Sequence, residues 1–185
     1  MEKTYITAQS LLEDSFRLAA QVYEDGFRPK FVIGIWRGGT PVGIAVQEYF
    51  EYKDVETDHI AVRTSSYYGI NKQSKTIKVH GLQYLVENAN AEDSLLIVDD
   101  VFDSGRSIDA LINQTQQLMR KNYPKDVRVA TPWYKPGNNK TKMVPDYFVH
   151  ESSDWLVFPH ELKGLSDEEV KCKTDLSNII DLFID

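Results

Sequence analysis

The residues of this chain best suited to chemistry follow a single apolar run. Asp99 and Asp100 come directly after Leu95-Leu96-Ile97-Val98, and the turn Asp103-Ser104-Gly105-Arg106-Ser107 follows two residues later. Carboxylates accept strongly from hydroxyl groups and attract Mg²⁺, a hard cation that favours oxygen ligands. The turn offers small side chains, hydroxyls and successive backbone N–H groups, which suits a phosphate cradle at a helix N-terminus. The spacing therefore predicts a phosphate-binding turn beside two acids.

The elements on either side of this turn are a strand and a helix. The apolar run has no polar alternation, which suits a parallel strand buried on both faces, and helical spacing follows over about 106–121. Polar residues between such elements lie at the carboxyl edge of a sheet, where open α/β folds bind ligands. The alternative is an ordinary strand and a helix capped by Ser107 or Asp103, although a cap alone does not require Asp99 and Asp100.

The rest of the chain alternates strand and helix patterns, which argues for an α/β fold with a mainly parallel sheet flanked by helices. Further strands are expected at 31–36, 58–63, 127–133 and 147–150, and further helices at about 8–25, 41–51 and 82–87.

Three local patterns refine this outline. Thr40 is expected to cap the helix whose first residue is Pro41. Ser166-Asp167-Glu168-Glu169 forms a capping box that opens the last helical stretch. Residues 64–78 are polar and lack helical periodicity, which indicates an exposed, mobile loop or ribbon.

Size, composition and charge restrict the class of protein. The 185 residues are 42% hydrophobic and 26% charged, as in an ordinary globular protein, and we expect one domain over 1–185. A net charge of −7 is a poor match to nucleic acid, so an anionic ligand must be met locally by backbone amides, a few Arg or Lys side chains and a divalent cation. No apolar run approaches the roughly 18 residues of a membrane span. The N-terminus lacks an apolar signal region and Cys172 is the single cysteine, so we expect a cytoplasmic protein without disulfides.

The segment from Leu95 to Ser107 resembles the phosphoribosyl-pyrophosphate signature of type I phosphoribosyltransferases at every position. The resemblance extends over roughly residues 30–162, with the motifs in the expected order, and favours the hypoxanthine(-guanine) branch. It implies a small hood, at approximately 1–10 and 135–185, that carries the base-binding segment. It also implies a homodimer or homotetramer.

The same resemblance implies the residues that hold phosphoribosyl pyrophosphate and Mg²⁺. Asp103 would take the N7 proton of a purine as N9 attacks the anomeric carbon. Mg²⁺ would be held by Asp99, Asp100 and Glu161, the last at a position where the family has aspartate. The phosphoribosyl pyrophosphate ligands would be Arg37, Gly38, Gly39, Asp99, Asp100, Asp103, Ser104, Gly105, Arg106 and Ser107.

Gly38 and Gly39 are also expected to matter for the backbone of the binding site. Gly38 and Gly39 permit backbone conformations closed to other residues and let a ligand approach the main chain. A side chain at position 39 is therefore expected to harm ligand binding more than folding.

The base would be recognised by three residues. Lys135 resembles the family lysine that donates to the exocyclic 6-oxygen, a choice that disfavours adenine. Trp155 would stack on the base and the Leu156 carbonyl would accept from its edge. The alternative is that Trp155 and Phe158 are core aromatics.

A lid is the last feature that the resemblance implies. Ser66-Tyr67 resembles the pair in the flexible loop, here approximately 64–78, that closes over the active site and excludes water. The alternative is a plain polar hairpin.

The implied activity is purine salvage, by transfer of the 5-phosphoribosyl group to hypoxanthine or guanine, with xanthine a weaker substrate. Two alternatives stay open: a non-catalytic nucleotide-sensing regulator with the same fold, and a phosphoribosyltransferase for another base.

Overall fold

The computed structural model describes residues 3–68 and 75–184. Its elements along the chain are β1 (Lys3–Tyr5), α1 (Ala8–Glu24), β2 (Phe31–Trp36), α2 (Gly39–Tyr52), β3 (Asp58–Tyr68), β4 (Lys75–His80), α3 (Gln83–Asn88), β5 (Ser94–Val98), β6 (Val101–Phe102), α4 (Arg106–Met119), β7 (Asp126–Tyr134), β8 (Tyr147–Glu151), β9 (Trp155–Val157) and α5 (Asp167–Lys171), with 3-10 turns η1 (Arg120–Asn122), η2 (Pro136–Asn138) and η3 (Thr174–Leu182).

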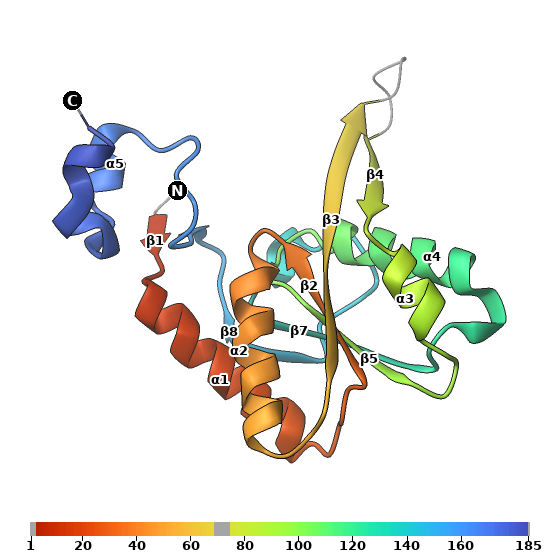
Figure 1. Cartoon of the computed structure of the whole chain (residues 1–185). Helices are drawn as coiled ribbons and strands as arrows, with labels where there is room; N and C mark the ends of the chain where they lie inside the picture. The colour runs from red at the N-terminus through yellow and green to blue at the C-terminus, as the bar shows by residue number, and fades with distance from the viewer. Residues whose placement is uncertain (1–2, 69–74, 185) are drawn as a thin grey trace.

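The main sheet has the strand order β4-β3-β2-β5-β7-β6 in the described part of the chain, and β8 also pairs with β7. Among the described strand pairs of this sheet, only β3–β4 is antiparallel. Helices α1 and α2 cover one face of the sheet, and α3 and α4 cover the other (Figure 1). The expected mainly parallel α/β fold is therefore confirmed.

Strand β5 shows why this sheet is buried on both faces. Leu96 and Val98 pack into the core under α1 and α2, whereas Leu95 and Ile97 pack into the core under α3 and α4. Alternate residues of a strand point to opposite faces, so an unbroken apolar run is what two helical layers require. The acids that follow this strand are thereby fixed at the carboxyl edge of the sheet.

A smaller unit, which we call the hood, lies beside this edge. Its strands β1 and β9 pair in parallel, with Lys3 opposite Trp155, and α5 and η3 lie next to them (Figure 1). An ion pair between Lys3 and Glu169 connects β1 to α5. The expected hood boundary at residue 135 is too early, because β8 belongs to the main sheet.

The hairpin of β3 and β4 projects from the sheet on the same side as the hood (Figure 1). Its register pairs Arg63 with His80 and Ser66 with Ile77. The expected ribbon is thus present at 64–68 and 75–78, and residues 69–74 of the expected lid lie outside the described residues.

Two helix starts test the capping predictions. The capping box is confirmed, since Ser166 accepts from Glu169 N and the Glu169 side chain accepts from Ser166 N. The predicted Thr40 cap is wrong: α2 begins at Gly39, with Gly38 as N-cap and no side-chain cap. Thr40 Oγ1 is buried without a hydrogen-bond partner, because the close packing of Gly38 and Gly39 moves the helix start toward the strand. No helix among the described residues is long and apolar enough to cross a membrane.

Candidate functional site

The acidic loop after β5 is held in place by the end of β7. Asp99 N donates to Ala130 O at 3.3 Å, and Trp133 N donates to Asp100 O at 3.3 Å. Lys135 N then donates to Phe102 O at 2.9 Å. These bonds connect two segments more than 30 residues apart, so Lys135 lies immediately beside the acidic loop.

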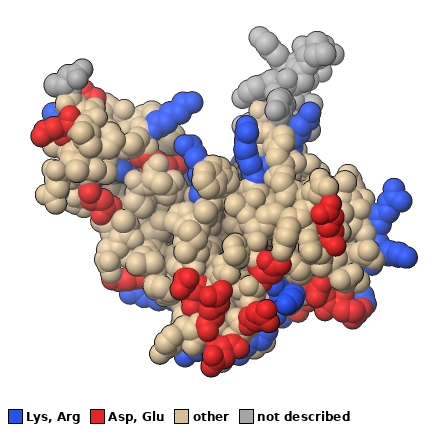
Figure 2. Space-filling view, in the orientation of Figure 1, with Lys and Arg blue, Asp and Glu red and all other residues tan. Residues whose placement is uncertain are grey.

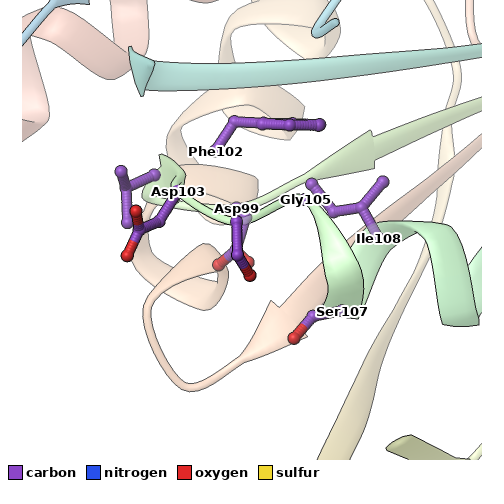
Figure 3. A pocket seen from close by; sticks show the side chains of 8 residues that line it. Asp99, Phe102, Asp103, Gly105, Ser107 and Ile108 are labelled. Carbon is purple, nitrogen blue, oxygen red and sulfur yellow. The ribbon is translucent and has the colours of Figure 1, made fainter. Parts of the chain in front are cut away.

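The turn at 103–107 has the backbone that a phosphate cradle requires. Gly105 is the N-cap of α4 and has a φ of +73°, in the left-handed region. A Cβ there would lie 2.7 Å from the ring of Phe102 and 2.7 Å from Thr141 Oγ1, so only glycine fits. A cavity of about 70 Å³ lies over the turn. The oxygens of Asp99, Asp103 and Ser107 point toward its open side (Figure 3).

The two adjacent acids carry an electrostatic cost without a ligand. Burial, and then the neighbouring charge of Asp100, raise the pKa of Asp99 well above its ordinary value. Asp100 is only 8% exposed. A divalent cation bound by these carboxylates together with substrate oxygens would relieve both effects. The pair therefore fits a Mg²⁺ ion that arrives with a phosphorylated substrate.

The loop at 36–39 packs directly against these acids and begins with a cis peptide between Trp36 and Arg37. A Cβ on Gly38 would lie 1.9 Å from Asp100 Oδ2, and one on Gly39 would lie 2.4 Å from the Val98 carbonyl oxygen. The expectation that a side chain at position 39 would harm ligand binding more than folding is therefore wrong. Glycine is needed there because two backbone segments of the protein touch, so a side chain would harm packing first.

A second cavity, of about 320 Å³, opens on the other side of Asp103, within the usual size range of small-ligand pockets. We call it the base pocket. It is lined by Val101, Asp103, Lys135, Asn138, Trp155, Leu156, Phe158 and Glu161. Residues predicted from separate motifs to bind a base thus share one cavity with the predicted base catalyst.

Two polar groups in this pocket are set up for a ligand. Lys135 is only 9% exposed, and no described residue accepts a hydrogen bond from its ammonium group. Lys135 lines the base pocket, so its ammonium is available to donate to a ligand oxygen there. Asn138 Nδ2 donates to Asp103 Oδ1 at 2.7 Å, which orients the carboxylate and leaves its second oxygen for a ligand proton.

The aromatic residues of the pocket separate into two roles. Trp155 is 57% exposed at the pocket wall, with Lys3 Nζ 6.0 Å from its ring centroid. Phe158 is 2% exposed and belongs to the core under α1 and α2. The core reading thus holds for Phe158 and not for Trp155, and Leu156 is buried between them in β9.

Glu161 lies in the base pocket rather than in a cluster with the acid pair. Its Oε2 accepts from Phe158 N at 3.1 Å. No three His, Cys, Asp or Glu side chains in the described part of the chain are grouped so that they could hold a metal. A three-carboxylate site of Asp99, Asp100 and Glu161 is therefore not preformed, because Glu161 is engaged in closing a turn.

Besides Asn138, two residues that the sequence did not single out contact residues of this site. His160 Nε2 lies 3.2 Å from Asp100 Oδ2, and its ring stacks on Phe158. Lys173 is 3% exposed and donates from Nζ to Phe158 O at 2.6 Å. Burial lowers the pKa of Lys173, and Glu161 and Asp175 oppose that change. Neither residue has a signal in spacing, because each acts through a contact between segments distant in the chain.

The remaining predicted residues lie around the site. Arg106 is exposed at the first position of α4, beside the phosphate turn. Arg37 lines a separate cavity with Trp36, Arg63 and Thr64. Ser66 is exposed on β3, and Tyr67 follows it in the same strand; their lid role stays a prediction.

Comparison with known proteins agrees with this geometry. A family model described as a phosphoribosyl transferase domain matches residues 3–166. No curated protein matches the chain.

Solved structures also resemble the chain. A purine phosphoribosyltransferase from Pyrococcus horikoshii is 26% identical, with a TM-score of 0.69 over 90% of this chain and 99% of that one. A xanthine-guanine-hypoxanthine phosphoribosyltransferase from Helicobacter pylori is 19% identical, with a TM-score of 0.68 over 97% and 99%. A hypothetical protein from Neisseria gonorrhoeae with bound ppGpp is 21% identical, with a TM-score of 0.70 over 91% and 93%. The last two show likeness of fold alone.

The family model spans most of the chain, including the acid pair, the phosphate turn and the base pocket. The chain therefore belongs to the phosphoribosyl transferase domain family, a family of glycosyltransferases.

Proposed function

We propose that this protein transfers the 5-phosphoribosyl group from phosphoribosyl pyrophosphate to a 6-oxopurine. The observation that carries the proposal is the base pocket, which places Lys135, Asp103 and an exposed Trp155 around one cavity next to the phosphate turn. The likeness to a purine phosphoribosyltransferase at 26% identity supports a purine as the acceptor.

The sugar donor would occupy the loop between β5 and α4. Backbone N–H groups and hydroxyls of 104–107 would receive the 5′-phosphate at the N-terminus of α4. The carboxylates of Asp99 and Asp100 would accept from the ribose hydroxyls. Mg²⁺ bound there with the donor would supply charge neutralisation for the diphosphate.

The base would enter between Trp155 and Val101. The ammonium of Lys135 would donate to the 6-oxygen, an interaction that the amino group of adenine cannot accept. As the N9–C1′ bond forms and the bond from C1′ to the pyrophosphate oxygen breaks, the N7 proton passes to the free oxygen of Asp103. Asn138 holds Asp103 in place for this step.

A base panel tests the proposal. Nucleotide formation is measured with hypoxanthine, guanine, xanthine and adenine at saturating phosphoribosyl pyrophosphate, with and without a chelator. We expect hypoxanthine and guanine to be good substrates. Xanthine should be weaker by about tenfold, because its second carbonyl would face the acceptors Leu156 O and Glu161 and leave a buried polar group unpaired, at about 1–3 kcal/mol. Turnover of adenine would overturn the role of Lys135, and no turnover of any base would overturn the function.

A further inference from the structure

The hood continues beyond the part of the chain that the family model matches. That match ends at residue 166, and α5 and η3 follow it beside β1 (Figure 1). We call residues 167–184 the C-terminal extension. Only two of its residues are buried, Val170 at 7% and Lys173 at 3% exposed. A segment that buries so little apolar surface gains little from the hydrophobic effect, so its position depends chiefly on polar contacts.

Two of these contacts attach the extension to the start of the chain. Glu169 forms the ion pair with Lys3 of β1. Asp175 Oδ2 accepts from Ala8 N at 2.8 Å, at the first residue of α1, where a carboxylate also interacts favourably with the helix dipole. Acidic side chains lie on the surface of the extension (Figure 2). Its most buried residue, in contrast, is the cation Lys173.

Lys173 connects the extension to the wall of the base pocket. Its Nζ donates to Phe158 O at 2.6 Å, and the same carbonyl accepts from Glu161 N at 3.0 Å. Phe158 N donates in return to Glu161 Oε2 at 3.1 Å. We call residues 158–161 the pocket turn, since Phe158 and Glu161 both line the base pocket. The ammonium group of Lys173 thus adds a third hydrogen bond to the two that close this turn.

The charge of Lys173 is matched by carboxylates on two sides. Burial lowers the pKa of Lys173, whereas Glu161 and Asp175 favour its charged form. Burying a charge costs free energy even when it is paired, and an apolar side chain would attach a segment at lower cost. A lysine at the most buried position of the extension therefore indicates a role beyond attachment.

Glu161 has one carboxylate oxygen left for a ligand. Its Oε2 is held by Phe158 N, and no group of the described residues donates to its Oε1. In the proposed function Glu161 faces the 2-position of the purine. A carboxylate oxygen accepts strongly from an amino group, so Oε1 would bind the 2-amino group of guanine. Hypoxanthine carries hydrogen at that position and would gain nothing from this oxygen.

We propose that Lys173 is a positioning residue of the base pocket, which holds the pocket turn so that Glu161 faces the 2-position of the bound purine. This inference rests on the proposed function, because it takes a 6-oxopurine as the ligand. Lys173 does not itself line the pocket, so it acts through Phe158 and Glu161. Its effect is selective for guanine over hypoxanthine, since these bases differ only at the 2-position.

Binding of guanosine 5′-monophosphate and inosine 5′-monophosphate to the full-length protein, measured by calorimetry, tests the inference. Lys173→Met keeps the length of the side chain and removes the ammonium group. The preference for the guanosine nucleotide, expressed as the ratio of the two Kd values, should fall by about 5- to 10-fold. Lys173→Gln keeps a donor for Phe158 O without the charge and should give an intermediate ratio. Lys171→Met is the matched control, because it removes an exposed lysine of the same extension, and its ratio should stay within twofold.

The ratio separates positioning from general damage to the hood, which would weaken both nucleotides equally. A double-mutant cycle tests the route through Glu161. In a Glu161→Ala background, Lys173→Met should change the ratio less than twofold, because the residue that it positions is gone. An unchanged ratio in Lys173→Met alone, or a full change in the Glu161→Ala background, would overturn the inference. Should Lys173→Met fail to fold, Lys173→Gln takes its place in the cycle under the same criteria.

Failure of the proposed function gives a different result. If no base is turned over and the unchanged protein binds neither nucleotide, the function and the inference are both overturned. Purine turnover with an unaltered ratio in Lys173→Met would overturn the inference alone. The expected change of the ratio without any turnover would overturn the transfer reaction and support the role of Lys173 in binding the purine.

Discussion

His160 Nε2 lies 3.2 Å from Asp100 Oδ2, so the segment that follows the base-binding strand contacts the acid pair at the end of β5. With a proton on Nε2, the His160 ring donates to this carboxylate. The contact joins the side of the site that would hold the base to the side that would hold the sugar and the cation.

His160→Phe should raise the KM for phosphoribosyl pyrophosphate by about 3- to 10-fold, the usual value of one hydrogen bond at roughly 1 kcal/mol. Phenylalanine keeps the stacking on Phe158, whose centroid is 5.8 Å from the imidazole, and removes only the donor. Steady-state kinetics at varied donor concentration measure the effect. His160→Gln, which can still donate, is the control and should recover most of the affinity; identical kinetics for all three proteins would show that the bond is incidental.

Asp103→Asn should lower kcat by roughly 100-fold or more, because general base catalysis is typically worth 10²- to 10⁴-fold. Binding of phosphoribosyl pyrophosphate should be largely unchanged. Asn138→Ala should lower kcat by a smaller factor, since it removes the 2.7 Å bond that orients Asp103 but leaves the carboxylate. Single-turnover rates with hypoxanthine check both, and an Asp103→Asn enzyme of normal kcat would exclude the base role.

Alanine at the two neighbouring glycines should have different consequences. In Gly39→Ala the new Cβ meets backbone, the Val98 carbonyl oxygen at 2.4 Å, and the melting temperature should fall by several degrees. In Gly38→Ala the new Cβ meets the Asp100 side chain, which can rotate, so binding of magnesium phosphoribosyl pyrophosphate should suffer more than stability. Thermal melting and calorimetry on both variants measure the contrast; the reverse pattern would refute it.

Asp99→Asn should stabilise the ligand-free protein at neutral pH. The folded-state pKa of Asp99 is raised, chiefly by burial, so the folded state binds its proton more tightly than the unfolded state does. The stabilisation of the folded state by the proton on Asp99 is complete below the ordinary pKa of about 3.9. This stabilisation is lost as the pH rises through the raised folded-state pKa. The asparagine Oδ1 can still accept from Asp100 N. Melting curves from pH 4 to pH 8 should show that the melting temperature of Asp99→Asn exceeds that of the unchanged protein by an amount that grows with pH. A difference independent of pH would contradict this origin.

The sequence predicts the parts of this fold that local patterns determine. The run at 95–98 and the helical spacing after 106 place the acid pair and the phosphate turn at the sheet edge, where the structure has them. The capping box at 166–169 is local as well. These features depend on residues within a few positions of one another.

Features that depend on distant contacts could not be predicted in this way. β1 is only three residues long and is a strand because it pairs with β9. The start of α2 is displaced from Thr40 because Gly39 packs against the end of β5. Asn138, His160 and Lys173 reach the site through single hydrogen bonds to residues that no spacing rule connects to them.

The pairing of β1 with β9 also bears on the order in which the molecule forms. Lys3 emerges early in synthesis, whereas its partner Trp155 follows about 150 residues later. Closing so long a loop costs entropy before the pairing contributes anything. Every strand of the main sheet except β8 comes from segments made before residue 135, so the phosphate turn is expected to exist before the wall that carries Trp155 is in place. The newly made protein would therefore acquire its means of holding the sugar phosphate ahead of its means of selecting a base.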